Sequence, residues 1–328
     1  MFSYKKDKLK IRSFLFLSVL MPLTAFSQDH DNLVNFPWFT GPLLAPTPIN
    51  MSPGHPSIEP SLTIFNTYGK YDSKWKMKKQ DNIWAINPLI DFQFGITDSL
   101  GIETLAATIS NFQNGQSSTH FQDTIVLFGY QLSNDINGSW VPDCRLFLHE
   151  TFPSGKYQNL NPKKMGIDST GQGSYQTGPA ISIRKRFCLH KHFLYLYWSL
   201  GYLFPSTVRV KGFNTYGGGF GTKGKVRPGQ SLTAFFSGEY SINQRWALAF
   251  DSQLTYQKKS RFSGRKGKDV FGLAAQVGLP ESVQFSFAPE FEYNFGPGSG
   301  LLAGLWFTVF GKNSSAFASA FLAYLHVF

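Results

Sequence analysis

Beyond its N-terminal region, the sequence has no apolar run long enough to form a membrane-spanning helix. Such a helix needs about 20 apolar residues, so a bilayer protein built from this chain has to be a β-barrel. Acidic residues are also few: 20 Asp and Glu stand against 31 Lys and Arg, which leaves a net charge of +11. Aromatic residues, by contrast, make up 16% of the sequence, which suits the outer face and aromatic girdles of a membrane barrel.

The N-terminus has the features of a secretory signal peptide. A basic region that ends at Arg12 leads into the apolar run 11–23, and Ala25-Phe26-Ser27 offers small residues for cleavage before Gln28. The alternative, an N-terminal membrane anchor, needs a longer apolar run. We therefore expect residues 1–27 to be a cleaved signal peptide.

Two segments show a clear alternation of apolar and polar side chains. From Trp246 to Tyr256 the even positions are apolar apart from Ser252, and from Val283 to Phe295 the odd positions are apolar. A soluble sandwich could contain one such strand, but the repetition favours the wall of a transmembrane antiparallel up-and-down β-barrel.

Ten further segments match this pattern more weakly, and each is long enough for an oblique crossing, which takes about 9–11 residues. They are 57–69, 82–95, 99–110, 121–132, 143–152, 174–188, 191–204, 230–241, 301–310 and 316–328. Single-chain bacterial barrels have an even strand number. We therefore predict about twelve strands in a barrel domain over 57–328, with fourteen as the alternative.

The joints between these strands alternate between tight turns and longer loops, as in barrels with short periplasmic turns and long external loops. The expected external loops are 71–81, 111–120, 153–173, 205–229 and 259–281. The last of these contains a weak strand pattern at 269–279, and we assign it to a loop, with a hairpin of its own as one option, because a thirteenth strand would make the count odd.

The last strand, Ala316 to Phe328, alternates bulky with small or polar positions and ends on an aromatic residue. It resembles the C-terminal signature of Gram-negative outer-membrane barrels, although His326 stands where an aromatic ring is usual. The resemblance implies an outer-membrane location, recognition by the barrel-insertion machinery, and termini in the periplasm.

Most of the basic residues fall in the predicted external loops. They include Lys74, Lys76, Lys78, Lys79, Lys225, Arg227, Lys258, Lys259, Arg261, Arg265 and Lys266. A basic rim that faces outer-membrane lipid and phosphorylated lipopolysaccharide is one interpretation, and a funnel for anionic solutes is the other. Because these cations lie in separate loops of an exported chain, we do not expect nucleic acid as a partner.

Four carboxylates, with one arginine near a turn, are the candidates for lining the lumen. They are Glu239, Asp251, Glu290 and Glu292, with Arg245. Barrel interiors are generally polar, so a purely structural role, with the acids paired to Arg245, lysines or water, is one interpretation. The other is a cation-preferring constriction, because rings of acidic side chains select cations.

The two cysteines, Cys144 and Cys188, are predicted at the periplasmic ends of neighbouring strands in an oxidising compartment. A disulfide forms there if their Cα atoms lie within about 7 Å, and the alternative is two unpaired thiols.

No catalytic, metal or cofactor site is predicted. A hydrolase needs a nucleophile beside an oriented base, and the best local candidate, His149 followed by Glu150, has no adjacent serine. His190 and His192 flank a turn without a third metal ligand nearby. The glycine-rich stretch 216–221 follows no βα pattern, so it is read as a flexible loop rather than a phosphate cradle.

The segment 28–56 contains many prolines, including Pro42, Pro46, Pro48 and Pro53, which exclude a regular helix or a central strand. It is either a periplasmic tail or a plug folded into the barrel mouth. Trp38 and its apolar neighbours favour partial insertion.

Several short motifs resemble a family of predicted outer-membrane transporters of the type labelled phenol meta-pathway degradation (MetA-pathway-like). The motifs are Phe39-Thr40-Gly41-Pro42-Leu43-Leu44-Ala45-Pro46, Gly54-His55, Glu59-Pro60, Phe152-Pro153-Ser154-Gly155-Lys156-Tyr157, Ala288-Pro289-Glu290-Phe291-Glu292-Tyr293 and Gly311-Lys312-Asn313. The resemblance implies a barrel for passive movement of small molecules, including hydrophobic or aromatic ones, with no catalytic residues. The alternatives are a closed structural barrel without transport and, further from the pattern, an outer-membrane hydrolase.

Overall fold

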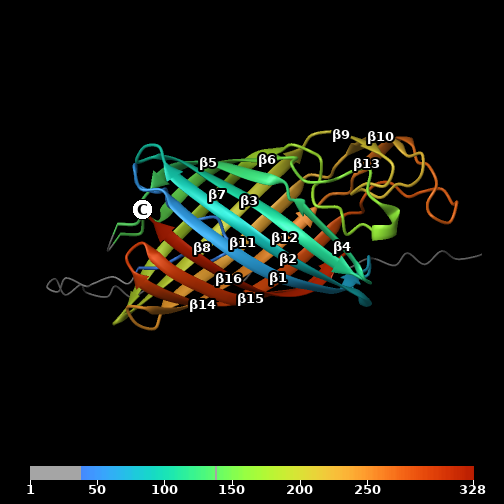
Figure 1. Ribbon diagram of the computed structural model, residues 1–328. Coiled ribbons are helices and arrows are strands. Elements are labelled where there is room, and N and C mark those ends of the chain that lie inside the picture. The colour runs from blue at the N-terminus through green and yellow to red at the C-terminus, as the bar shows by residue number, and fades with distance from the viewer. Residues whose placement is uncertain (1–37, 137–138) are drawn as a thin grey trace, which may run out of the picture. The chain divides into compact units, whose positions relative to one another are not determined.

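The computed structural model describes residues 38–136 and 139–328, and its architecture is all-β (Figure 1). Twelve antiparallel strands close into a barrel, as the sequence predicted. The wall is built from β1 (Ser57–Tyr71), β2 (Met77–Gly95), β3 (Leu100–Gln113), β5 (Thr124–Ser133), β6 (Asp143–Phe152), β7 (Gln176–Leu189), β8 (His192–Pro205), β11 (Ser231–Ser241), β12 (Trp246–Gln257), β14 (Ser282–Gly296), β15 (Ser299–Lys312) and β16 (Ser315–Val327). A short strand, β4 (Gln116–Phe121), lies just before β5 and continues its pairing along β3.

Each wall strand pairs with its neighbours in the chain, and the first strand pairs with the last. Ser57 of β1 lies opposite Val327 of β16, and Ser57 also lies opposite Gln93 of β2. Closure of the ring leaves no free edge along the wall, which satisfies the backbone hydrogen bonds that a bilayer would otherwise leave unmade.

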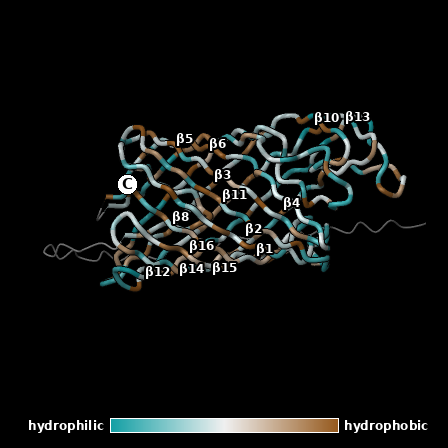
Figure 2. Tube along the Cα trace, viewed as in Figure 1, coloured by the Kyte–Doolittle hydropathy of each residue, from teal (hydrophilic) through white to brown (hydrophobic). Residues whose placement is uncertain are grey.

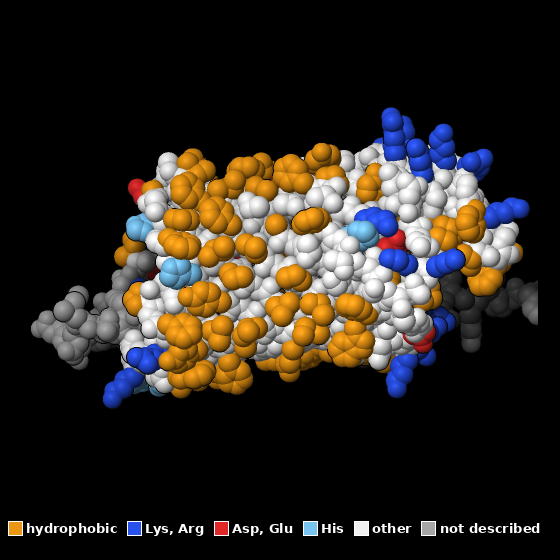
Figure 3. Space-filling view, viewed as in Figure 1, with side chains coloured by type: hydrophobic (Ala, Val, Ile, Leu, Met, Phe, Trp, Pro, Cys, Tyr) orange, Lys and Arg blue, Asp and Glu red, His pale blue; other side chains and the backbone are white. Residues whose placement is uncertain are grey.

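The two faces of the wall differ as the alternation requires. In β16, Leu322 and Tyr324 are exposed on the outside, whereas Phe321, Ala323 and Leu325 point inward and are buried. Exposed apolar side chains occur on the other strands too. On the face that Figure 3 shows, they form a broad apolar belt, and Figure 2 shows hydrophobic residues recurring along the strands of the wall. Within the described residues, no helix is long and apolar enough to cross a membrane.

The two ends of the barrel differ in the length of their connections. The end that holds the C-terminus has mostly tight turns, such as that between β2 and β3, whereas the opposite end has the long connections after β6, β8 and β12 (Figure 1). Two expected external loops are shorter than predicted, because β2 begins at Met77 and because β3 and β4 form a hairpin through 108–121. These extensions carry polar residues on both faces, so the hydropathy alternation stops while the hydrogen-bonded ladder continues.

The loops after β8 and β12 join in a small second sheet. Its strands are β9 (Val208–Lys211), β10 (Lys223–Arg227) and β13 (Arg261–Arg265), in the order β13-β10-β9. Within the loop 259–281, β13 pairs with β10 of the preceding long loop, and Lys268 also forms a local antiparallel bridge with Ala274. Val208, Val210, Tyr216 and Val226 form a buried core under this sheet, and this core explains why two loops distant in sequence fold together.

Candidate translocation path in the barrel lumen

The segment from Trp38 to Met51 lies inside the barrel, near the end that holds the C-terminus. Its prolines prevent regular hydrogen bonding within the segment, so its backbone groups need partners on the wall. Gly41 donates its N–H to Glu239 at 2.9 Å, Leu44 donates to Asp251 at 2.7 Å, and Thr40 donates to Glu292. Carboxylates on β11, β12 and β14 thus hold the first half of the segment.

The second half of the segment is held through its carbonyl groups. Arg145 donates to the carbonyl oxygens of Thr47 and Ile49, both at 3.3 Å. Ser182 donates to the carbonyl of Pro46 at 2.8 Å, and Gln131 donates to that of Pro48 at 3.0 Å. The wall therefore presents acceptors where the segment offers N–H groups and donors where it offers carbonyls.

Apolar contacts add to these polar ones. Leu43 and Leu44 pack against the buried cluster of Ala288, Leu302, Phe321 and Ala323. Near the start of the segment, the Phe39 ring meets the Tyr195 ring edge-on at 4.8 Å. These contacts bury apolar side chains that would otherwise line a wet lumen, which favours the docked position.

The four predicted lumen acids are close together inside the barrel. Glu239, Asp251, Glu290 and Glu292 are each at most 2% exposed. Glu239 lies beside Glu292, and Asp251 lies beside Glu290. Their burial among one another is unusual for carboxyl groups, and the N–H groups of the inserted segment supply part of what water would otherwise provide.

Arg245 is not part of this group. It lies just before β12 at the rim, where it is exposed and its guanidinium is 3.4 Å from the Tyr293 hydroxyl. The interpretation that Arg245 pairs with the lumen acids is therefore wrong. Its position one residue before β12 puts it on the turn, and the side chain extends along the outside of the wall.

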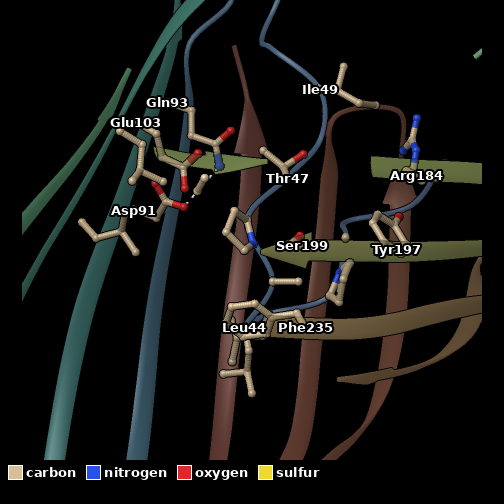
Figure 4. A pocket seen from close by; sticks show the side chains of 18 of the residues that line it. Leu44, Thr47, Ile49, Asp91, Gln93, Glu103, Arg184, Tyr197, Ser199 and Phe235 are labelled. Carbon is tan, nitrogen blue, oxygen red and sulfur yellow. Dashed lines mark hydrogen bonds between the residues drawn. The ribbon is translucent and has the colours of Figure 1, made fainter. Parts of the chain in front are cut away.

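A second acidic group, which the sequence pattern did not predict, lies on the opposite wall. Glu59 lies directly opposite Asp91 in the β1–β2 ladder, and Glu103 lies opposite Gln93 in the β2–β3 ladder. Figure 4 shows Asp91, Gln93 and Glu103 together on one side of a cavity. The odd positions of β2 face inward, so the parity of this strand could have revealed the group, but its alternation is weaker than in β12 and β14.

Arg145 is the cation of this second group. Its side chain is almost fully buried, lies 3.5 Å from the Glu103 carboxylate, and covers the Phe147 ring at 4.5 Å. A Cβ atom on Gly129 would come within 2.1 Å of the guanidinium, so a glycine is needed there. Arg145 thus connects the wall acids to the carbonyls of the inserted segment.

A second arginine marks the far side of the same cavity. Arg184 is paired with Asp143 at 2.7 Å and lies over the Tyr195 ring at 4.6 Å. In Figure 4, Arg184 and Tyr197 lie across the cavity from Asp91 and Glu103, with the inserted segment between them. Each side of the lumen at this level therefore combines carboxylates with an arginine: Arg145 lies beside Glu103 on one side, and Arg184 lies near Tyr197, which donates to Glu239, on the other.

Two cavities lie in series along the lumen. The one beside the inserted segment has a volume of about 610 Å³, and the one toward the long loops about 560 Å³. Both are lined by Leu105, Ile125, His149 and Leu203, and this set is called the waist below. The loop-side cavity is bounded by the loop residues 169–172 and by apolar wall residues such as Leu89 and Ile109.

His149 lies at the waist rather than in a catalytic arrangement. Its Nε2 is 2.9 Å from the Thr151 hydroxyl, and the neighbouring Glu150 instead accepts a hydrogen bond from Thr177. His149 and Glu150 are successive strand residues, so they point to opposite faces of the wall. Among the described residues there is no group of three or more His, Cys, Asp or Glu side chains that could hold a metal ion.

The two cysteines are free, so the disulfide alternative is wrong for this structure. Cys144 lies opposite Ile183 in the β6–β7 ladder, five residues before Cys188 on β7. Five strand residues span about 16 Å, well beyond disulfide reach, and an odd separation also puts Cys188 on the other face.

The predicted basic loop residues fall on two structures. Lys74, Lys76, Lys78 and Lys79 lie on the hairpin between β1 and β2, where Lys78 is 3.4 Å from Asp72. The remaining residues lie on or beside the small second sheet: Lys225, Arg227, Lys258, Lys259, Arg261, Arg265 and Lys266.

Comparison with known proteins gives a match only at the level of structure. No protein-family model matches the sequence, and no curated protein matches it. The fold resembles the COG4313 outer membrane channel from Pseudomonas putida F1, with a TM-score of 0.67 and 13% identity over 88% of this chain and 100% of that chain. The fold is that of an outer-membrane β-barrel.

Two further solved barrels match less well. The NanC porin has a TM-score of 0.38 and 11% identity, covering 81% of this chain and 98% of that one. The TodX ΔS2S3 monoaromatic hydrocarbon channel has a TM-score of 0.41 and 11% identity, covering 84% and 91%. The closed barrel and its apolar belt, together with the fold shared with the COG4313 outer membrane channel, place the protein in the outer membrane of a Gram-negative bacterium.

Proposed function

We propose that the protein is a passive channel for small molecules across the outer membrane. The observation that carries this proposal is the pair of lumen cavities, of about 610 and 560 Å³, which meet at the waist. A barrel of this size can fill its interior with side chains, as a purely structural protein would. The two cavities leave open space along the lumen, which favours a translocation path over a barrel filled by its own side chains.

The proposed orientation has the tight turns and the C-terminus in the periplasm and the long loops outside. Outer-membrane barrels have short periplasmic turns and longer external loops, and this chain has the same asymmetry. A signal peptide over residues 1–27, which lies outside the described residues, fits export to that compartment. The insertion machinery would then recognise the strand that ends at Phe328.

The proposed cargo is a small, mainly apolar molecule with one or two hydrogen-bonding groups, such as a simple aromatic compound. The loop-side cavity combines apolar residues, among them Leu89, Ala107 and Ile109, with polar ones such as Asn111 and Gln122. Apolar walls with a few placed polar groups are typical of small-molecule sites. The motif resemblance to transporters of the phenol meta-pathway type supports the same class.

The inserted segment is proposed to act as a plug within the domain 28–56. Its three N–H contacts to carboxylates and its carbonyl contacts to Arg145 hold it across the lumen at the periplasmic side. A closed structural barrel is the second candidate, because these same contacts would suit a permanent closure. An enzyme is not proposed, since the neighbouring carboxylate of Glu150, which would have to orient the His149 imidazole, is hydrogen-bonded to Thr177 instead.

A flux assay with matched variants of β8 tests the channel. Leu203 lines the waist, whereas Phe204, the next residue of the same strand, is exposed toward lipid and is not among the residues that line either cavity. In proteoliposome swelling with graded small solutes, we expect the unaltered protein to admit amino-acid-sized solutes, including aromatic ones. We expect Leu203→Trp to slow swelling several-fold and Phe204→Trp to leave it unchanged. No swelling above protein-free liposomes would contradict the channel and support the closed barrel.

A further inference from the structure

The small second sheet has one strongly cationic face. In β9, β10 and β13, charged residues alternate with buried or small ones, so the charged side chains share a side. Cross-strand rows join Lys211, Lys223 and Arg265, then Arg209 and Lys225, then Arg227 and Arg261. All seven side chains are exposed, and we call this set the cationic face.

The opposite side of the sheet is apolar. Val208, Val210 and Val226 point into the buried loop core, with Phe262 packed against it. This core fixes the strands and leaves the cationic face no freedom to turn away. Neighbouring strands lie about 4.8 Å apart, so each row holds like charges directly opposite one another, which is unfavourable for the sheet by itself.

Across residues 38–136 and 139–328, no acidic side chain forms an ion pair with these cations. The two acids of the surrounding loops are used elsewhere. Asp269 accepts backbone N–H groups from Phe271 and Leu273, and Glu281 is paired with Lys312. A row of unneutralised cations on a fixed sheet calls for an anionic partner from outside the chain.

The direction of the cationic face indicates which anion it meets. In Figure 3, Lys and Arg side chains project sideways from the region where Figure 1 labels β9 and β10, just beyond the apolar belt. They point away from the barrel axis, as the lipid-facing side chains of the belt do. In the orientation proposed above, this position is the headgroup layer of the surrounding outer leaflet rather than the open medium.

We propose that the cationic face is a binding site for the phosphate groups of lipopolysaccharide packed against the barrel. On the middle strand, Lys223 has a cation directly opposite on both neighbouring strands. Lys225 and Arg227 have one each, so a phosphate near this strand would meet at least two cations. Guanidinium groups bind phosphate oxygens in pairs, and ammonium groups add point charges. The site is independent of solute transport, so it can hold if the channel proposal fails.

Removal of one row tests the proposal in the full-length protein. The row variant Arg209→Gln with Lys225→Gln removes two charges from the cationic face. Its matched control, Lys191→Gln with Arg245→Gln, removes two exposed charges from the opposite rim. Binding of fluorescent lipopolysaccharide to detergent-solubilised protein is measured with the phosphates intact and after dephosphorylation. Inorganic phosphate and single-stranded DNA serve as competitors at equal phosphate concentration.

We expect the row variant to bind intact lipopolysaccharide about 25-fold more weakly, because one Lys or Arg near an anionic surface contributes about five-fold in affinity. The control should stay within two-fold, and dephosphorylation should remove the difference. Thermal unfolding without lipopolysaccharide should be unchanged or slightly higher in the row variant, which shows that it folds. The proposed site would be overturned if the control variant bound lipopolysaccharide as weakly as the row variant. It would also be overturned if the unaltered protein bound dephosphorylated lipopolysaccharide as tightly as the intact form. Displacement by DNA or inorganic phosphate at equal phosphate would overturn its assignment to lipopolysaccharide.

Discussion

The three carboxylates that accept N–H groups from the inserted segment give a sharp test of docking. Replacement of Glu239, Asp251 and Glu292 by alanine leaves the N–H groups of Thr40, Gly41 and Leu44 without their acceptors. An unsatisfied donor costs about 1–3 kcal/mol when it is buried. Because the segment is only half-buried, we take about 1 kcal/mol for each of the three, or about 3 kcal/mol in total.

A loss of this size raises the population of the undocked segment about 100-fold, since about 1.4 kcal/mol is a factor of ten. Hydrogen exchange, followed by mass spectrometry of peptides that cover 38–51, reports this population directly. We expect exchange there to be about 100-fold faster in the alanine variant, with the wall strands unchanged. The amides in the second half of the segment, which is held through its carbonyl groups, should show the same acceleration of exchange, because the segment undocks as one unit.

The matched control keeps an oxygen acceptor at each position through Glu239→Gln, Asp251→Asn and Glu292→Gln. It should exchange close to the unaltered rate if hydrogen-bond acceptance, rather than charge, holds the segment. Unchanged exchange in the alanine variant would refute the reasoning, because it would mean that the remaining contacts, those of Leu43, Leu44 and Arg145, hold the segment without the carboxylates.

Three further outcomes follow from the same structure. Arg145→Met leaves the buried Glu103 carboxylate without its cationic partner and should lower the free energy of unfolding by about 3–5 kcal/mol in a thermal or urea titration. Adding Glu103→Gln should restore part of this loss. Burial works against the charge of Asp168, but the Asn161 N–H and the Lys156 ammonium outweigh it and lower the pKa of Asp168 below 3.8. The Lys156–Asp168 pair should therefore stabilise its loop above pH 3.8 and lose this stabilisation as the pH falls through the lowered pKa. The loss should appear as faster hydrogen exchange of the loop amides at low pH. Asp168→Asn should abolish this pH dependence. Alkylation without reductant should add two alkyl groups to the chain, as measured by mass spectrometry, since both cysteines are free. A chain that gains alkyl groups only after reduction would contradict this.

The strand number and the faces of β12 and β14 could be predicted because their outward residues are almost all apolar. The same parity puts Asp251, Glu290 and Glu292 on the inner face, where the structure has them. Arg245 was placed wrongly because it lies on the turn before the strand, where parity no longer fixes the direction of a side chain.

Other features depend on contacts that no local pattern encodes. Thr40 meets Glu292 across 252 positions of sequence, and β10 meets β13 between two separate loops. The acids of β1 to β3 were missed for a different reason: Phe65 faces inward there, beside Trp306 and Phe317, so apolar and polar residues share the inner face. Mixed faces weaken the alternation on which the prediction of a strand's orientation depends.

Single-channel recording in planar bilayers tests the central claim most directly. The unaltered full-length protein and a form that lacks residues 28–51 are refolded in parallel, and only preparations with the folded barrel are used. If the lumen is a path closed by the inserted segment, the unaltered protein should show brief openings to a reproducible level. The shortened form should then be open most of the time at a larger conductance. Silence from both forms would contradict the account and leave the protein a closed structural barrel.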